Sequence, residues 1–172
     1  MKADILSAVS CLILLTVSAA IHEAGHMLAA KLAGIPCRKL KFCAAGGMIA
    51  FDFSRSSYFS EAFVHLGGAV FGMASAMIAY AALGKQALEY FGATAVLSCV
   101  NLLPIRGLDG GAVLLCILNM IFLPDTAEKI AGTVSFVFWT ALWFSAVGMG
   151  LRGSHDLWLL IFALSVMLIG SG

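Results

Sequence analysis

The sequence predicts an all-α polytopic membrane protein of about six transmembrane helices, with one small β-hairpin. Hydrophobic residues make up 62% of the 172 residues and charged residues only 11%, and the mean hydropathy is +1.02. Soluble domains of this size are far less apolar. The apolar residues also fall in runs of roughly 20, the length that a helix needs to cross a bilayer. We therefore expect a single membrane-embedded domain over residues 1–172. The net charge of +1, without a basic run, argues against nucleic-acid binding.

The first predicted span runs from about Ile5 to Ala33 and ends at Gly34 and Pro36, which stop a helix. A cleaved signal peptide is the alternative, because small residues follow the apolar run. Asp4 and a helical pattern that continues through Ala33 favour a retained span.

The segment Arg38–Phe53 alternates polar and apolar residues on either side of Gly46 and Gly47. This pattern is typical of two short strands joined by a tight turn. A polar loop then leads to the second predicted span, Glu61–Leu83, which is rich in Gly, Ala and Ser. Such small residues let helices approach closely in lipid.

The third predicted span covers about Ala87–Leu103 and stops at Pro104, where a glycine-rich break follows. The next apolar run, Ala112–Leu123, is short, so a short or partly re-entrant span is expected. Two further spans are predicted at about Glu128–Gly150 and His155–Ile169.

Basic residues indicate the orientation of these spans. Seven of the ten Lys and Arg residues fall on one side of the six-span arrangement, namely Lys31, Arg38, Lys39, Lys41, Arg55, Arg106 and Arg152. The positive-inside rule places this side in the cytoplasm and both termini outside. His22 lies roughly 25 Å along the first helix from Ile5, near the cytoplasmic surface, and the break after the third span lies at the same level.

The segment His22-Glu23-Ala24-Gly25-His26 has the pattern HExxH. Residues four apart share one face of a helix, so both imidazoles can reach one tetrahedral zinc ion, with Glu23 beside them as a general base. A catalytic zinc site needs a third protein ligand. Asp109 is the other acid near a break inside the membrane, so we expect it to be that ligand.

Each of these residues also has a purely structural interpretation. The two histidines and Glu23 could form a polar patch between packed helices, Asp109 could be a turn residue before glycine, and Asn101 could simply tie down a helix end. The alternative function is a non-proteolytic metal-binding or haem-binding membrane protein, or a metal transporter subunit, and a further alternative is an inactive relative. The five cysteines form no CxxC pair, so no zinc ribbon or disulfide framework is indicated.

The HEAGH motif, the hairpin with its glycine pair and the motif N-x-x-P-x-x-x-L-D-G-G, here NLLPIRGLDGG, occur in this order. Together they resemble the site-2 protease family of intramembrane zinc metalloproteases over roughly residues 19–115. The small form without a PDZ domain is most similar, the form that includes proteases of sporulation sigma factors. The resemblance implies an M50-type endopeptidase.

The resemblance also implies the site. One zinc ion would be bound by His22, His26 and Asp109, with Glu23 as the general base and Asn101 holding the substrate carbonyl or oxyanion. The hairpin around Gly46 and Gly47 would lie in the membrane and present an extended substrate strand.

The implied substrate is a membrane-anchored protein, such as a membrane-tethered transcription or sigma factor, cut near the cytoplasmic leaflet. Recognition would come from the membrane core, the loops or a separate regulatory membrane partner. The sequence departs from the family pattern at Arg106, where many relatives carry proline or an uncharged residue. It also departs over residues 67–71, which resemble a G-P-x-x-N stretch without its proline and asparagine.

Overall fold

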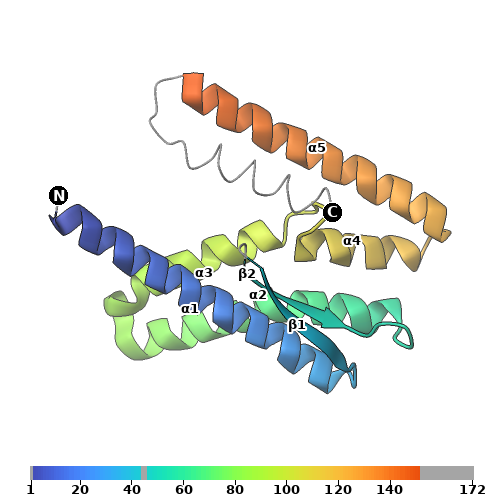
Figure 1. Cartoon of the computed structure of the whole chain (residues 1–172), viewed down its shortest axis with the longest axis horizontal. Helices are drawn as coiled ribbons and strands as arrows, with labels where there is room; N and C mark the ends of the chain where they lie inside the picture. The colour runs from blue at the N-terminus through green and yellow to red at the C-terminus, as the bar shows by residue number, and fades with distance from the viewer. Residues whose placement is uncertain (1, 44–45, 152–172) are drawn as a thin grey trace. The chain divides into compact units, whose positions relative to one another are not determined.

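The computed structural model describes residues 2–43 and 46–151 (Figure 1). The chain divides between Leu102 and Leu103 into two compact units. The first unit contains, in order, α1 (Lys2–Leu32), β1 (Cys37–Cys43), β2 (Gly46–Phe51), α2 (Tyr58–Leu83), the 3₁₀ turn η1 (Gly84–Ala87) and α3 (Leu88–Asn101). The second unit contains α4 (Asp109–Asn119) and α5 (Pro124–Leu151). The single domain expected over residues 1–172 stays a prediction.

The described part of the chain is mostly helical, with one small sheet, as predicted. Two stretches are long and apolar enough to cross a membrane: Val9–Leu32 in α1, and Tyr58–Asn101, which comprises α2, η1 and α3. The total of six spans stays a prediction, and the last predicted span, His155–Ile169, lies outside the described residues. α2 begins three residues earlier than the sequence pattern predicts, because the Ser57 hydroxyl caps it by accepting the Ser60 N–H.

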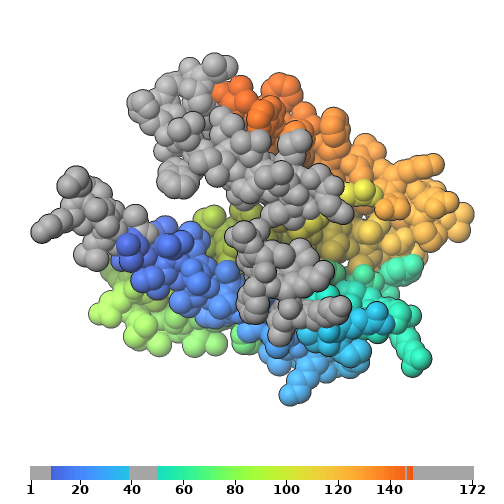
Figure 2. Space-filling view, viewed as in Figure 1, coloured from blue at the N-terminus to red at the C-terminus, as the bar shows by residue number. Residues whose placement is uncertain are grey.

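The side chains of the first unit are arranged as expected for a protein surrounded by lipid. Large apolar side chains of α1 and α2 are exposed, and Figure 2 shows the α1 side chains, in blue, on the near face. The interior instead holds small and polar residues, and the largest fully buried side chains are Val64, Thr94 and Ser18. Burial of large apolar residues does not hold helices together in lipid, so close packing of small residues and interhelical hydrogen bonds take that role.

The helices α1, α2 and α3 pack against one another in this unit. Where α1 and α2 cross, a Cβ added to Gly25 would lie 2.5 Å from the Gly67 carbonyl oxygen, so the two backbones are in direct contact. Buried Ser18 on α1 and Thr94 on α3 hydrogen-bond through their hydroxyls at 2.9 Å. The close crossing and this bond fix α1, which carries both histidines of the HExxH motif, against its neighbours.

The hairpin has both predicted strands, but its glycines are placed differently. β1 and β2 pair antiparallel, with Phe42 opposite Gly47 and Cys43 opposite Gly46. The prediction that Gly46 and Gly47 form the turn is therefore wrong: they are the first residues of β2, and residues 44–45, which connect the strands, lie outside the described residues. Glycine adopts extended and turn conformations with similar ease, so a glycine pair between two strand patterns does not fix the position of the turn.

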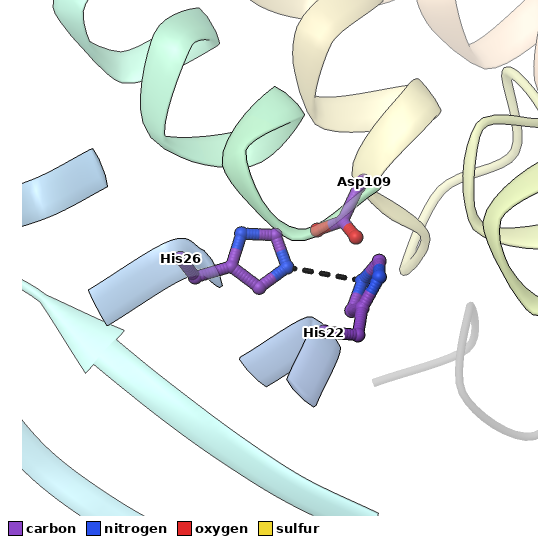
Figure 3. Close-up of side chains that lie close together, drawn as sticks. All are labelled: His22, His26 and Asp109. Atoms are coloured by element: carbon purple, nitrogen blue, oxygen red, sulfur yellow. Dashed lines mark hydrogen bonds between the residues drawn. The ribbon is translucent and has the colours of Figure 1, made fainter. Parts of the chain in front are cut away.

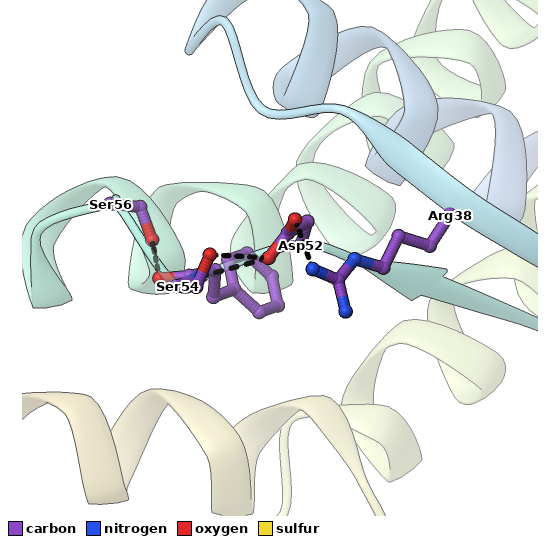
Figure 4. Close-up of polar contacts among 5 residues, drawn as sticks. Arg38, Asp52, Ser54 and Ser56 are labelled. Atoms are coloured by element: carbon purple, nitrogen blue, oxygen red, sulfur yellow. Dashed lines mark hydrogen bonds and ion pairs between the residues drawn. The ribbon is translucent and has the colours of Figure 1, made fainter.

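An ion pair and two hydrogen bonds hold the base of the hairpin (Figure 4). The Arg38 guanidinium lies 2.6 Å from one carboxylate oxygen of Asp52. The Ser54 hydroxyl donates to the other oxygen at 2.7 Å, and the Ser54 backbone N–H donates to it at 3.2 Å. These bonds hold the pKa of Asp52 below its ordinary value; the Ser54 hydroxyl lowers it most, then the Ser54 N–H, and Arg38 adds less.

Replacing Ser54 with alanine is expected to raise the pKa of Asp52 toward its ordinary value of 3.8. Because the folded-state pKa is depressed, the stabilising contribution of Asp52 is complete above the unfolded-state pKa and is lost as the pH falls through the folded-state pKa. The carboxyl-carbon chemical shift of Asp52, followed by NMR against pH, measures the change. Arg38→Gln is the control, with a smaller expected shift. An unchanged titration in Ser54→Ala would contradict the assignment.

The second unit begins with a turn that leads into α4. The sequence predicts a break that lasts until Gly111, but α4 already begins at Asp109. The reason is that Leu108 is extended, with φ −105° and ψ 159°, and its carbonyl accepts the N–H groups of Gly111 and Ala112. Asp109 therefore lies in the first turn of a helix, where the helix dipole favours a negative charge.

Candidate metal centre

The two histidines of the HExxH motif lie one turn apart on α1 and meet inside the first unit (Figure 3). Their Nε2 atoms are 3.1 Å apart, and the ring centroids are 4.8 Å apart with the planes at 82°. Only 4% of His22 and 6% of His26 is exposed. The i, i+4 spacing therefore brings two buried imidazole nitrogens to one point.

This arrangement fits a metal ion. Two nitrogen ligands of one tetrahedral zinc, at Zn–N distances of about 2.0–2.1 Å, lie about 3.3–3.4 Å apart. The separation of 3.1 Å between the Nε2 atoms of His22 and His26 is close to this value. The donor set also suits zinc, which imidazole nitrogen binds readily.

The orientation of the His26 ring is set by α2. Its Nδ1 lies 2.8 Å from the backbone carbonyl of Val64. A carbonyl can only accept, so Nδ1 carries the hydrogen, and in the neutral ring the lone pair is then on Nε2. Metal-binding histidines usually donate the N–H of their other ring nitrogen to such an acceptor. Here this hydrogen bond aims Nε2 at His22.

Gly68 on α2 provides the space in front of both nitrogens. A Cβ at this position would collide with Nε2 of His26 and would lie 2.7 Å from Nε2 of His22. Any side chain at residue 68 would thus occupy the region into which both ring nitrogens point. In the packing of this chain, glycine at residue 68 leaves that region open.

Two further predicted residues lie in the same unit. Glu23 is half-buried on α1, directly after His22. Asn101, the last residue of α3, is also half-buried, and its Nδ2 lies 3.4 Å from Nε2 of His22. The structure therefore brings the Asn101 amide to the histidine pair. Gly46 and Gly47 are the first residues of β2, where they offer backbone groups.

Asp109 belongs to the second unit, where it is half-buried at the start of α4. Its role as a third ligand stays a prediction from the sequence. The aspartate is the first residue of the helix, two residues before Gly111.

Sequence reasoning missed three participants near the histidines. Val64 supplies a backbone carbonyl, which leaves no trace in a side-chain pattern. Gly68 was noted as one of several small residues in an apolar helix and as part of the departure over residues 67–71, without a link to the histidines. His65 lies with its ring centroid 6.4 Å from that of His26 and 5.6 Å from that of Phe53, a proximity that no spacing rule in the sequence predicts.

Known proteins resemble this chain in sequence and in fold. The model of Peptidase family M50 matches residues 10–95, which is half of the chain and includes His22, Glu23 and His26. Among solved structures, the site-2 protease from Methanocaldococcus jannaschii is similar, with a TM-score of 0.70 and 21% sequence identity. The match covers 92% of this chain and 74% of that one, so the two share a fold. No curated protein sequence matches the chain. The family match, which includes the whole HExxH motif, shows that the chain belongs to peptidase family M50.

Proposed function

We propose that this protein is a zinc-dependent intramembrane endopeptidase that hydrolyses a peptide bond of a membrane-anchored protein near the cytoplasmic leaflet. Membership of peptidase family M50 and the fold shared with a site-2 protease support a membrane metalloprotease. The observation that carries the proposal is the convergence of His22 and His26, whose buried Nε2 atoms lie 3.1 Å apart.

The proposed ligands of one zinc ion are His22, His26 and Asp109. Each can offer one ligand atom, an imidazole nitrogen from either histidine and a carboxylate oxygen from the aspartate. Two histidines and one carboxylate are a common ligand set of zinc peptidases and leave one position for water or substrate. When bound, zinc supplies a Lewis acid that polarises the scissile carbonyl and makes water a nucleophile near neutral pH.

The protein's own side chains would move the protons and hold the carbonyl. Glu23 accepts a proton from the attacking water, whose oxygen bonds to the carbonyl carbon. The C–N bond then breaks, and the proton passes from Glu23 to the leaving nitrogen. Asn101, whose amide lies beside His22, donates a hydrogen bond to the carbonyl oxygen as negative charge develops there.

A substrate helix has to unwind before cleavage, because its carbonyls are otherwise bonded within the helix. We propose that the substrate pairs with the hairpin as an added strand. The sheet has two strands in the described part of the chain, so each has an edge that the partner strand does not use. Proline at Gly46 or Gly47 removes one backbone donor. Unchanged cleavage of a membrane-anchored substrate by both variants would exclude pairing through these residues.

Zinc binding tests the ligand set directly. We expect the purified native chain to hold about one zinc ion and the Asp109→Asn variant to lose most of its affinity, because an amide is a far weaker ligand than a carboxylate. Asp125→Asn is the matched control, since Asp125 is also in the first turn of a helix but is exposed. Metal content by mass spectrometry and affinity by chelator competition measure the effect. Equal zinc binding by both variants would exclude Asp109 as a ligand.

A further inference from the structure

The turn that precedes Asp109, residues 103–108, is tightly folded in the second unit. The Ile105 N–H donates to the carbonyl two residues earlier at 2.7 Å, and the Leu108 N–H donates to the Ile105 carbonyl at 3.1 Å. Gly107 has φ +89°, a conformation that glycine adopts without strain. Ile105 is only 2% exposed and anchors the turn by its side chain. The 103–108 turn therefore ends directly at the carboxylate that we propose as a zinc ligand.

The first turn of α4 packs against this turn. A Cβ added to Gly111 would overlap the Ile105 carbonyl oxygen and would lie 3.1 Å from the Arg106 nitrogen. Gly111 is thus in backbone contact with the turn, and Asp109 lies between the two segments in sequence. A displacement of the 103–108 turn would consequently be transmitted to the position of Asp109.

On its other side, the turn is bonded to α5. The backbone N–H of Arg106 donates to the Ser135 hydroxyl at 2.8 Å, and Ser135 is 8% exposed. The Arg106 guanidinium lies 3.2 Å from a Glu128 carboxylate oxygen. It passes over Gly132, where an added Cβ would lie 3.8 Å from Nη2. Residues 128, 132 and 135 share one face of α5 because they follow the i, i+4, i+7 spacing.

The two contacts of Arg106 differ in how strongly they hold the 103–108 turn. The side chains of Arg106 and Glu128 are 52% and 64% exposed, so water screens their ion pair and its contribution is small. Ser135 is buried, and removal of its hydroxyl would take away the hydrogen-bond partner of the Arg106 N–H. The hydrogen bond to Ser135 therefore fixes the turn more strongly than the ion pair.

We infer that Ser135 is a positioning residue for Asp109: by accepting the Arg106 N–H, its hydroxyl holds the 103–108 turn in the conformation from which Asp109 can bind the metal. The inference rests on the proposed function, because Asp109 is a ligand only in that proposal. It assigns to α5, which lies outside the residues matched by the family model, a role in forming the metal site.

Zinc affinity of the full-length protein tests the inference. We expect Ser135→Ala to bind zinc about tenfold more weakly, at the low end of the 10–100-fold loss typical when a residue supporting a metal ligand is removed. Ser135→Thr keeps the hydroxyl and is expected to restore native affinity. Thr133→Ala is the matched control, because this exposed hydroxyl on the same helix bonds only its own helix, at the Lys129 carbonyl. The visible spectrum of the cobalt-loaded Ser135→Ala protein adds a second measurement, and we expect it to differ from the native spectrum. A merely structural role of Ser135 would leave the spectrum unchanged at saturating metal.

A second pair of variants tests the donor of this hydrogen bond, the Arg106 N–H, in place of the acceptor. Arg106→Pro lacks the N–H, whereas Arg106→Gln keeps it and loses only the ion pair. We expect the proline variant to match Ser135→Ala and the glutamine variant to stay within about twofold of native affinity, as for an exposed ion pair. The double variant Arg106→Pro, Ser135→Ala is expected to be no weaker than either single variant, because both remove one bond.

The outcomes separate this inference from the proposed function. Native protein that binds no zinc would overturn the proposed function and this inference with it. Native protein that binds zinc, with Ser135→Ala or Arg106→Pro binding equally well, would overturn the inference alone. A Ser135→Thr variant that fails to keep the native zinc affinity would also overturn it.

Discussion

A Gly68→Ala variant is expected to bind zinc at least about 100-fold more weakly than the native protein, beyond the range for a supporting residue because both proposed histidine ligands are affected in this chain's packing. The added Cβ would collide with Nε2 of His26 and would lie 2.7 Å from Nε2 of His22. Neither ring can move away easily, because Val64 holds His26 and both rings are buried. The methyl group would therefore take the place in front of the two nitrogens.

Gly72→Ala is the matched control for this variant. It lies one turn further along α2 and is also buried, but a Cβ there would lie 3.4 Å from Thr94 Cγ2 and 3.7 Å from Ser98 Oγ, which are ordinary contacts. Chelator competition measures zinc affinity, and circular dichroism verifies that both variants are helical. Native zinc affinity in Gly68→Ala would show that the two Nε2 atoms do not bind the metal from this side.

Replacing Glu23 with glutamine is expected to lower the cleavage rate by about 10²–10⁴-fold while zinc remains bound, because the amide cannot accept the proton of the attacking water. The change preserves the size of the side chain and leaves both histidines in place. Co-expression with a membrane-tethered transcription factor, followed by gel analysis of its cleavage, measures the rate. Metal analysis of the purified variant gives the zinc content.

Glu61→Gln is the control for charge removal, since Glu61 is a half-buried acid at the start of α2. Cleavage in Glu23→Gln at the native rate would exclude Glu23 as the base. Zinc binding by the native chain without cleavage of any membrane-anchored substrate would instead favour a metal carrier or an inactive relative.

The sequence predicts the local parts of this structure well. The apolar runs predict α1, α2 and α3 closely, and the alternation in Arg38–Phe53 predicts the two strands. The shared face of His22 and His26 follows from their spacing alone. These features depend on residues near one another in the chain, so periodicity and spacing suffice to predict them.

The parts that the sequence did not predict depend on long-range contacts or on backbone groups. The Ser135 hydroxyl bonds a backbone N–H 29 residues away, and no spacing rule relates the two. The contact of Gly68 with the two histidines depends on how α1 packs against α2, which the sequence alone does not predict. The start of α4 at Asp109 was missed because a glycine-rich sequence predicts a break, whereas the extended conformation of Leu108 begins the helix earlier.

The hydrogen bond from His26 to the Val64 carbonyl has a consequence for genetics. Because the acceptor is a main-chain atom, every amino acid at residue 64 still provides it, and mutational scanning at that residue would record the effects of the side chain and not the loss of the acceptor. Substitutions at residue 64 therefore cannot remove the acceptor of this hydrogen bond. Selection can act on it through substitution of the donor, His26, or through substitutions that change the distance between α1 and α2.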